Sequence, residues 1–537
     1  MTIDAKDEDD KVEVTLKDVN IDASSRSEAA VSVTGKGDTT IELDGDNELK
    51  SGAGHAGLEH NKTDTSGELT IQDKDNNGSL EAAGGFKGAG IGSAGSNDAQ
   101  VKITGGNITA TTSDDWGAGI GSGSYGTGTV EITGGEINAT GGYLGAGIGG
   151  GCNGSGNVTI SGGTITAAGS DGAAGIGGGY YNGATVTITG DAVIKNASST
   201  KYGAGIGGGN GSDGNVTISG NAKIENATGG YGAAGIGGGA FSSPDKIGNG
   251  NVVIKDNAKI DNVQGGAYGA GIGGGIYGLS NVTIEGNTKV NATGGAGGAA
   301  IGGGAGAENN SDNNGNQITI KSNENGSPTI NAVGGGTDEG EKIVIGGAGI
   351  GAGCESDADA DITLEGKVTI TATAGKDNVA IGANGIEQEF SGLAEGSSIT
   401  RYDPEGNDTT LPTDPGYPVP AAPSSSGGGS ADASVQESVF PGLVVTDKDG
   451  QRISYTSIRG NNVLSIRVGR FTASLRASLA TLRQLRAEGI DTITFQTILC
   501  STTLSVDELL AMGGEDTEVV LTHHIRSSTL TVGGKAV

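Results

Sequence analysis

The sequence predicts an all-β fold: a right-handed parallel β-helix (β-solenoid) of about twelve coils over residues 1–395, followed by a small α+β domain. Three observations lead to this prediction. Glycine accounts for 108 of the 537 residues, one apolar phrase recurs about every 29 residues, and each period contains three short apolar pulses. Self-similarity at such a period is typical of repeat units that stack along one axis.

The recurring phrase is Gly-Ala-Gly-Ile-Gly-Gly-Gly, with close variants. Its central isoleucine lies at Ile91, Ile120, Ile148, Ile176, Ile206, Ile236, Ile272, Ile301, Ile350 and Ile381. The steps between them are 28 to 31 residues, apart from one of 36 and one of 49. Asn-, Asp- and Ser-rich stretches at 242–251 and 308–316 fall in the two long steps and predict surface loops.

Two further pulses complete each period. One is a Val-Thr-Ile run, as at 158–160 and 216–218, and the next is a single isoleucine such as Ile165 or Ile224. Alternation places Val and Ile inside the column and Thr outside. Three strands per coil would pair with the next coil at about 4.8 Å. Glycines permit positive φ and close approach of backbones at the corners, and asparagines such as Asn215 and Asn251 are expected to stack and bond along the column.

The C-terminal part of the chain changes character. Residues 396–435 are rich first in proline and then in serine and glycine, which predicts a linker that is stiff and then flexible. Residues 436–537 contain Leu475, Leu479, Leu482 and Leu485 at helical spacing, a capped short helix beginning at Ser505, and strand-like runs. This composition predicts a small α+β domain of unknown role.

The net charge of -31 limits the partners. Binding to nucleic acid or to an anionic membrane surface depends on clustered Lys and Arg, which the chain lacks. The chain contains no stretch of about 20 apolar residues, so we expect no insertion into a membrane. Cys152, Cys354 and Cys500 are too few and too widely spaced for a disulfide framework or a zinc site.

Aromatic residues are concentrated beside the recurring phrase. Eleven of the twelve aromatic residues before residue 400 flank it, so that a stacked column would align them in one or two rows. Aromatic rings with a polar handle stack well on sugar rings. The candidate carbohydrate-binding residues are Trp116, Tyr143, Tyr202, Tyr231 and Tyr268. The alternative is that these rings stack on one another and shield the corners.

A candidate calcium site lies near the N-terminus. Asp73, Asp75 and Asn77 stand at alternate positions before Gly78, as at the start of a calcium loop. Gly84 occupies the position where such a loop has its closing glutamate. Calcium is therefore a candidate cofactor, and a polar turn is the alternative.

No residue is assigned a catalytic role. Polysaccharide lyases and hydrolases need paired carboxylates, or calcium with a basic residue. Asp114 and Asp115 are consecutive, and consecutive side chains in a strand point to opposite faces. We expect a protein that is not an enzyme, with a polysaccharide lyase or hydrolase as an alternative.

The strand phrases at 14–21, 29–31, 40–43 and 47–49 resemble bacterial carbohydrate-binding-domain-containing proteins of the calcium-dependent, polygalacturonate-binding β-helix type. The later glycine-rich units are similar to repeats in large surface proteins of Gram-positive bacteria. The resemblance covers residues 12–390. It implies a bacterial extracellular or cell-surface protein, adhesin-like and non-catalytic, with an extended polysaccharide or glycan as partner. The signal peptide and anchor would lie outside this chain. A structural stalk displaying the C-terminal domain is the alternative.

Overall fold

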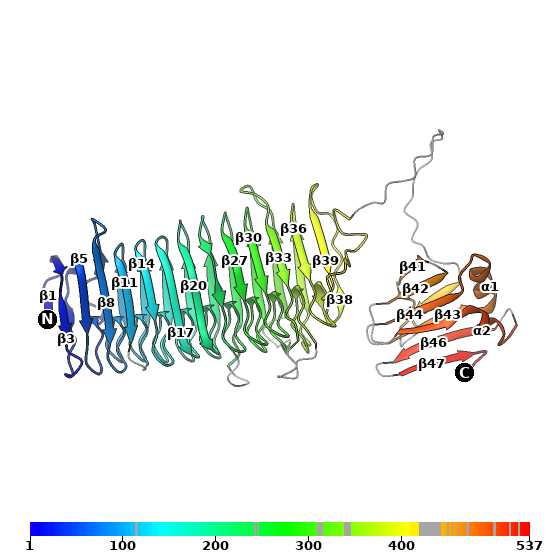
Figure 1. Ribbon diagram of the computed structural model, residues 1–537, viewed down its shortest axis with the longest axis horizontal. Helices are drawn as coiled ribbons and strands as arrows, with labels where there is room; N and C mark the ends of the chain where they lie inside the picture. The colour runs from blue at the N-terminus through cyan, green and yellow to red at the C-terminus, as the bar shows by residue number, and fades with distance from the viewer. Residues whose placement is uncertain are drawn as a thin grey trace. The chain divides into compact units, whose positions relative to one another are not determined.

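The repeats wind into a parallel β-solenoid, as predicted (Figure 1). The computed structural model describes residues 1–537 except 113–115, 241–242, 244–245, 309–314, 338–344, 418–441, 448–449, 454, 461, 469–471, 498–500, 515–516, 525–526 and 537. The chain divides into two units, Met1–Pro418 and Val419–Val537. Asp114, Asp115 and Cys500 lie outside the described residues, whereas Cys152 and Cys354 are buried free thiols.

Sheet A contains the recurring phrase. Its strands are β1 (Thr2–Ala5), β4 (Val31–Gly35), β6 (Leu58–His60), β9 (Ile91–Gly92), β12 (Ile120–Gly121), β15 (Ile148–Gly149), β18 (Ile176–Gly177), β21 (Ile206–Gly207), β25 (Ile236–Gly237), β28 (Ile272–Gly273), β31 (Ile301–Gly302), β34 (Ile350–Gly351), β37 (Ile381–Ala383) and β38 (Ile386–Glu387). All pair in parallel except β38, which is antiparallel to β37. The predicted number of about twelve coils is slightly low, because the coil that begins with β1 contains none of the repeat phrase.

Sheet B contains the Val-Thr-Ile runs. Its strands are β2 (Lys11–Lys17), the first part of β5 (Asp38–Lys50), β7 (Leu69–Gln72), β10 (Ala99–Ile103), β13 (Gly128–Ile132), β16 (Gly156–Ile160), β19 (Ala184–Ile188), β22 (Gly214–Ile218), β26 (Gly250–Ile254), β29 (Ser280–Glu285), β32 (Asn316–Lys321) and β35 (Ala360–Glu365). Val216 pairs with Val252 and Ile218 with Ile254, which forms the predicted apolar ladder. On the outer face, Asn251 donates to Asn215 at 2.9 Å, so the predicted asparagine stacking is confirmed there.

Sheet C contains the third pulse. Its strands are β3 (Asn20–Asp22), the second part of β5, β8 (Gly78–Gly84), β11 (Asn107–Thr112), β14 (Glu136–Thr140), β17 (Thr164–Asp171), β20 (Val193–Lys201), β23 (Lys223–Ile224), β24 (Ala227–Thr228), β27 (Lys259–Gln264), β30 (Lys289–Thr293), β33 (Thr329–Val333), β36 (Thr369–Thr373) and β39 (Ser398–Tyr402). The inward Val, Ile, Leu and Ala side chains of the three sheets form one continuous core.

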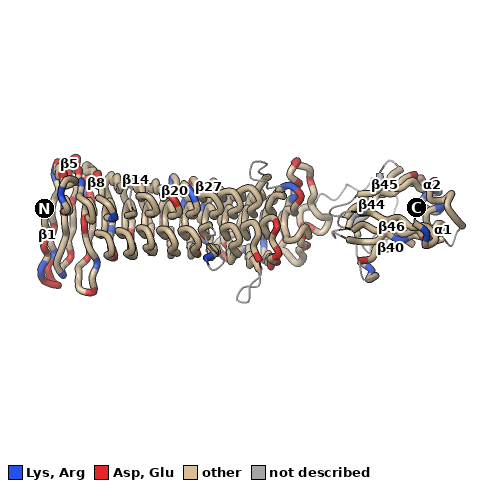
Figure 2. Tube along the Cα trace, turned by 90° about the horizontal axis from the view of Figure 1, so that it is seen from below, with Lys and Arg blue, Asp and Glu red and all other residues tan. Residues whose placement is uncertain are grey.

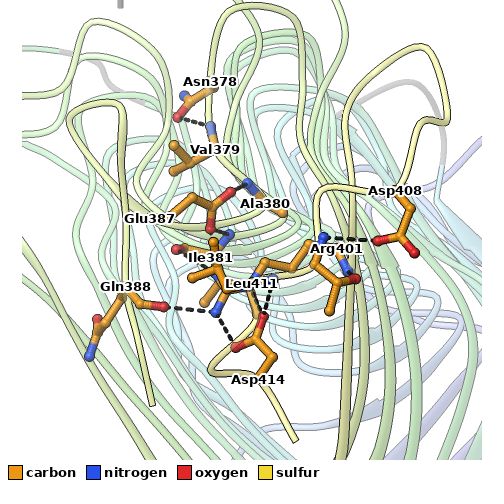
Figure 3. Close-up of polar contacts among 11 residues, drawn as sticks. Asn378, Val379, Ala380, Ile381, Glu387, Gln388, Arg401, Asp408, Leu411 and Asp414 are labelled. Atoms are coloured by element: carbon orange, nitrogen blue, oxygen red, sulfur yellow. Dashed lines mark hydrogen bonds and ion pairs between the residues drawn. The ribbon is translucent and has the colours of Figure 1, made fainter. Parts of the chain in front are cut away.

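A polar cluster closes the last coil of the column (Figure 3). The Arg401 side chain is fully buried and donates to both carboxylate oxygens of Asp414, at 2.6 and 2.9 Å, and to Glu387. The carboxylate of Glu387 accepts the backbone N–H groups of Ala380 and Ile381 at 2.7 and 3.1 Å. In the preceding coil, Ile350 donates instead to the carbonyl of Ala380. Glu387 thus replaces the carbonyls that a further coil would supply.

This cluster changes the boundary that proline content predicted. Strand β39 lies beyond residue 395 and pairs in parallel with β36. The carbonyl of Pro415 accepts the N–H of Ile399, and Thr410 and Asp414 bond to Arg401. Residues 396–417 are therefore part of the folded column and not the first half of a linker. Their prolines lie in turns against the last coil.

The second unit is mostly β, with two short helices. One antiparallel sheet contains β40 (Leu443–Thr446), β43 (Ala473–Ser478), β46 (Glu518–His524), β47 (Ser527–Val532) and β48 (Lys535–Ala536). The other contains β41 (Thr456–Gly460), β42 (Val463–Arg467), β44 (Thr492–Gln496) and β45 (Ser501–Ser505).

The helices of the second unit are α1 (Leu479–Ala487) and α2 (Val506–Leu510), capped by Ser478 and Ser505 respectively. Leu475 lies in β43, so the predicted leucine helix begins one turn later. Among the described residues, no helix is long and apolar enough to cross a membrane.

Candidate functional site

Two corners flank each copy of the phrase and lie side by side. In the Ile206 coil, Ala204 N–H donates to the carbonyl of Gly208 at 2.9 Å, so the chain enters and leaves the column at neighbouring points. We call the corner before the phrase the first corner and the corner after it the second corner. The first corner of each coil also forms a hydrogen bond with the second corner of the next coil. For example, the backbone carbonyls of Tyr202 and Tyr268 accept the backbone N–H groups of Ala240 and Ala305, both at 2.8 Å. The corners therefore form one continuous surface along the column.

The five predicted aromatic residues all lie at first corners. Tyr143, Tyr202 and Tyr231 expose 49%, 39% and 41% of their surface, and Trp116 and Tyr268 are half-buried. The ring centres of Tyr202 and Tyr231 are 6.2 Å apart, and those of Tyr231 and Tyr268 are 5.6 Å apart. Trp116 lies instead against Phe86, at 5.8 Å. The rings contact one another and also remain open to solvent, so both interpretations of them are compatible with this geometry.

A tyrosine from a second corner fills the one gap between these rings. The Ile176 coil has Gly172 at its first corner, and a Cβ built on Gly172 would lie 2.4 Å from the ring of Tyr180. Tyr180 therefore completes a series that we call the aromatic row: Phe86, Trp116, Tyr143, Tyr180, Tyr202, Tyr231 and Tyr268. Sequence spacing assigns Tyr180 to the other corner. In the sequence, its place in the aromatic row is indicated only by Gly172, which leaves room for the ring at the first corner.

The ring centres of Tyr180 and Tyr181 are 3.8 Å apart, and their planes are tilted by 41°. The ammonium of Lys246 lies 4.1 Å from the ring centre of Tyr181. Burial, followed by the hydrogen bond to Tyr181, raises the pKa of Tyr180 to about 12.

Several of these tyrosines have a backbone conformation that glycine adopts more easily. Tyr202 and Tyr268 have φ of +53° and +72°, whereas Gly172 and Gly297 occupy the same corner in other coils with φ of +86° and +81°. Tyr125, Tyr181 and Tyr277 have positive φ at second corners. A bulky residue in the left-handed region costs roughly 1–2 kcal/mol. Backbone preference therefore disfavours tyrosine at these positions.

The corner surface contains few charges. Figure 2 views the column from the side on which these loops lie. Two rows of loops run along it, charged residues are sparse in its middle part, and they gather near β1, β5 and β8. Beside the aromatic row, Asp171 and Lys201 of neighbouring coils form an ion pair at 2.9 Å. Among the described residues, the middle of this face therefore carries few charges, although the chain has a net charge of -31.

A hollow lies beside the N-terminal end of the row. Its volume is about 440 Å³, and the partly exposed ring of Phe86 forms one wall. The other lining residues are Ser24, Lys50, Ser51, Ala53, Ala83, Gly84, Gly85, Thr111 and Thr112. The ammonium of Lys87 lies 5.1 Å from the ring centres of both Phe86 and Trp116. Only Ala53, Ala83 and Phe86 supply apolar side chains, so the hollow lacks the predominantly apolar lining of small-molecule pockets.

The predicted calcium ligands form a hydrogen-bonded turn. The carboxylate of Asp73 accepts the N–H groups of Asn77 and Gly78 at 3.1 and 2.9 Å, and the Asn77 amide donates to Asp75 at 3.0 Å. Glu42, from the preceding coil, is the residue that sequence reasoning missed. Its carboxylate and those of Asp73 and Asp75 have oxygens within 4.8 Å of one another. Lys74 donates its N–H to Glu42 at 2.8 Å, and its ammonium lies 3.6 Å away. The hydrogen bonds are those of a polar turn, and the clustered carboxylate oxygens are also compatible with a calcium site.

We expect Asp73→Ala to lower the free energy of unfolding by roughly 1.5–3 kcal/mol, because two backbone donors lose a charged acceptor. Asp75→Ala, which removes only one exposed partner, should have a much smaller effect. Melting curves of the full chain, with millimolar calcium or a chelator, measure both variants. Under the turn interpretation calcium leaves the melting temperature of the parent unchanged. A calcium-dependent rise that disappears in Asp73→Ala would support the calcium site instead.

Comparison with known families agrees with the fold. The β-helix repeat family model matches residues 101–124, 130–152, 158–180 and 216–240. Each match begins in a strand of sheet B and ends just after a copy of the glycine-rich phrase. These four segments are similar to the β-helix repeat family, and all of them lie within the parallel β-solenoid. The search of curated proteins and the search of solved structures found no match.

Proposed function

We propose that the protein binds an extended, uncharged polysaccharide along the aromatic row, without cleaving it. The observation that carries this proposal is the placement of Tyr202 and Tyr268 at exposed corners with positive φ, where glycine would be better tolerated. Strained backbone that persists is a feature of functional sites. The rings supply apolar faces for stacking on sugars, and their hydroxyls supply hydrogen bonds.

The charge distribution supports the same ligand class. The described residues in the middle of the corner surface include few charged side chains (Figure 2), so they offer neither an anionic nor a cationic polymer strong Coulomb attraction. Coils repeat at about 4.8 Å, which is close to the length of one sugar unit in an extended glycan. A bacterial surface or secreted location, with an adhesin-like role, is part of the proposal.

The structural-stalk alternative makes a different prediction for the same residues. If the tyrosines only pack on their neighbours, removing them lowers stability and no ligand is lost. Tyr277 shows that such packing occurs, because a Cβ on Gly306 of the next coil would lie 2.6 Å from its ring. Stability and binding must therefore be measured on the same variants.

We expect the double variant Tyr202→Gly and Tyr268→Gly to lose binding while keeping its stability. Glycine relieves the left-handed strain of roughly 1–2 kcal/mol per residue, which offsets the lost ring contacts of about 0.5–1.5 kcal/mol each. Affinity gel electrophoresis against a panel of soluble polysaccharides measures binding, and thermal melting measures stability. A reducing-end assay on the same samples tests for cleavage.

Leu144→Gly is the matched control. Leu144 has φ of +70° at the first corner of the Ile148 coil, so glycine there relieves the same strain without removing a ring. This control should keep full binding. If the double variant melts early and the parent binds no polysaccharide, the stalk is the correct interpretation. Release of new reducing ends would identify an enzyme.

A further inference from the structure

Six of the seven rings of the aromatic row come from first corners, and they occupy two different positions there. Trp116, Tyr202 and Tyr268 stand four residues before the central isoleucine of their phrase. Phe86, Tyr143 and Tyr231 stand five residues before it. In the three consecutive coils of Ile206, Ile236 and Ile272, the ring therefore stands four, five and four residues before the central isoleucine. Within these three coils, neighbouring rings therefore leave from different backbone positions, and the same position returns after two coils. Tyr180, which comes from a second corner, interrupts the alternation between Tyr143 and Tyr202.

Backbone conformation separates the two positions. Tyr202 and Tyr268 are themselves the left-handed residue of their corner. In the coil between them the left-handed residue is Gly232, with φ of +76°, and Tyr231 precedes it. Leu144 and Lys87 likewise follow Tyr143 and Phe86, with φ of +70° and +68°. A change from one conformation to the other turns the Cα–Cβ bond, so the two classes of ring leave the backbone in different directions.

Around Tyr231 the ring planes follow this alternation, whereas Phe86 and Trp116 are tilted by 47°. Tyr231 stands at 88° to Tyr202 and at 72° to Tyr268. A flat sugar chain stacked face-on against Tyr202 therefore meets Tyr231 edge-on. Tyr202 and Tyr268 share both position and backbone conformation, and they are two coils apart, which is roughly 9.6 Å at the spacing of stacked strands.

We infer that the row takes a glycan whose structural repeat is a disaccharide, of the β-1,4-linked pyranose type. In the flat twofold chains of this type, such as β-1,4-linked glucose, mannose and N-acetylglucosamine, each sugar is turned over relative to the one before it, so the same ring face returns at every second unit. β-1,4-linked xylose prefers a threefold twist and serves as an intermediate case in the test. An α-1,4-linked chain winds into a helix and does not present one face at that interval. This inference rests on the proposed function and adds the linkage class of the ligand.

The test compares hexasaccharides that differ in linkage. Isothermal titration of the full chain with cellohexaose, β-1,4-mannohexaose, β-1,4-xylohexaose and chitohexaose is set against maltohexaose. We expect at least one β-1,4-linked hexamer to bind about tenfold more tightly than maltohexaose. Equal or tighter binding of maltohexaose overturns the inference and leaves polysaccharide binding in place. A parent that binds no hexamer and no polysaccharide overturns both.

Single substitutions test the two-coil period directly. Tyr202→Gly and Tyr268→Gly should each weaken binding of the preferred hexamer by roughly 2- to 12-fold, the range for one aromatic contact. Tyr231→Ala should weaken it less than about twofold. Equal losses for all three variants would contradict the alternation. Melting temperatures of the three variants, compared with the parent, separate a lost contact from a lost fold.

Discussion

Adding one methyl group at Gly207 is expected to disrupt the column. Gly207 has φ of +135°, and a Cβ there would lie 2.1 Å from the backbone carbonyl oxygen of Gly237 in the next coil. That conformation is nearly restricted to glycine and costs about 1–3 kcal/mol for other residues. Overpacking against backbone adds about 1–3 kcal/mol. Gly207→Ala should therefore lower the free energy of unfolding by roughly 2–6 kcal/mol.

Hydrogen exchange of the full chain, followed by mass spectrometry, locates this effect because the chain has two units. Peptides around β21 and β25 should exchange faster in Gly207→Ala, and peptides of the second unit should not change. Gly54→Ala is the control: Gly54 has φ of +92° but nothing within 4 Å of its added Cβ. It should show the conformational cost alone. Equal protection in Gly207→Ala and the parent would refute the steric argument.

Removal of the guanidinium at the end of the column should have the second large effect. Arg401→Met leaves the fully buried carboxylate of Asp414, together with Glu387, without its cation. Breaking a buried pair by removing one partner costs about 3–5 kcal/mol, since the remaining charge stays buried. Arg401→Lys should rescue only part of this loss, because an ammonium cannot form the two parallel bonds to Asp414.

Peptides covering 370–417 report on this loss by hydrogen exchange. Lys321→Met is a suitable comparison, since Lys321 forms a partly exposed pair with Glu285 at 3.4 Å. Exposed pairs contribute about 0.2–1 kcal/mol, so protection near β32 should change little. If Arg401→Met protects 370–417 as well as the parent does, the cluster does not hold the last coil in place.

The fold could be predicted because each coil repeats the same physical demand. Inward Ile and Val and the glycine after each central isoleucine recur at one period, and a stacked column is the arrangement that satisfies them all. The polar closure at Arg401 could not be predicted in this way. It occurs once, its partners at 387 and 414 are not at the repeat spacing, and the surrounding prolines resemble a linker.

The candidate site was predictable in position but not in geometry. Spacing places Tyr202, Tyr231 and Tyr268 at one corner, yet their tilt depends on which residue of the corner is left-handed. Tyr180 reaches the row only because Gly172 has no side chain. Glu42 joins Asp73 because β5 and β7 place Glu42 opposite Gln72, a contact that becomes visible once the two segments are aligned one period apart.

The carboxylate of Glu387 also determines how such a column can vary in length. It works as a chain terminator, in the sense used for polymers, because it occupies the growing end of sheet A, and β38 blocks the adjacent strand edge. The described strands of each earlier coil pair only with those of the neighbouring coils. Duplication or loss of whole periods within the column would therefore lengthen or shorten the aromatic row by whole coils and leave the terminator intact. Repeat number would then set the length of glycan bound, independently of the closing cluster.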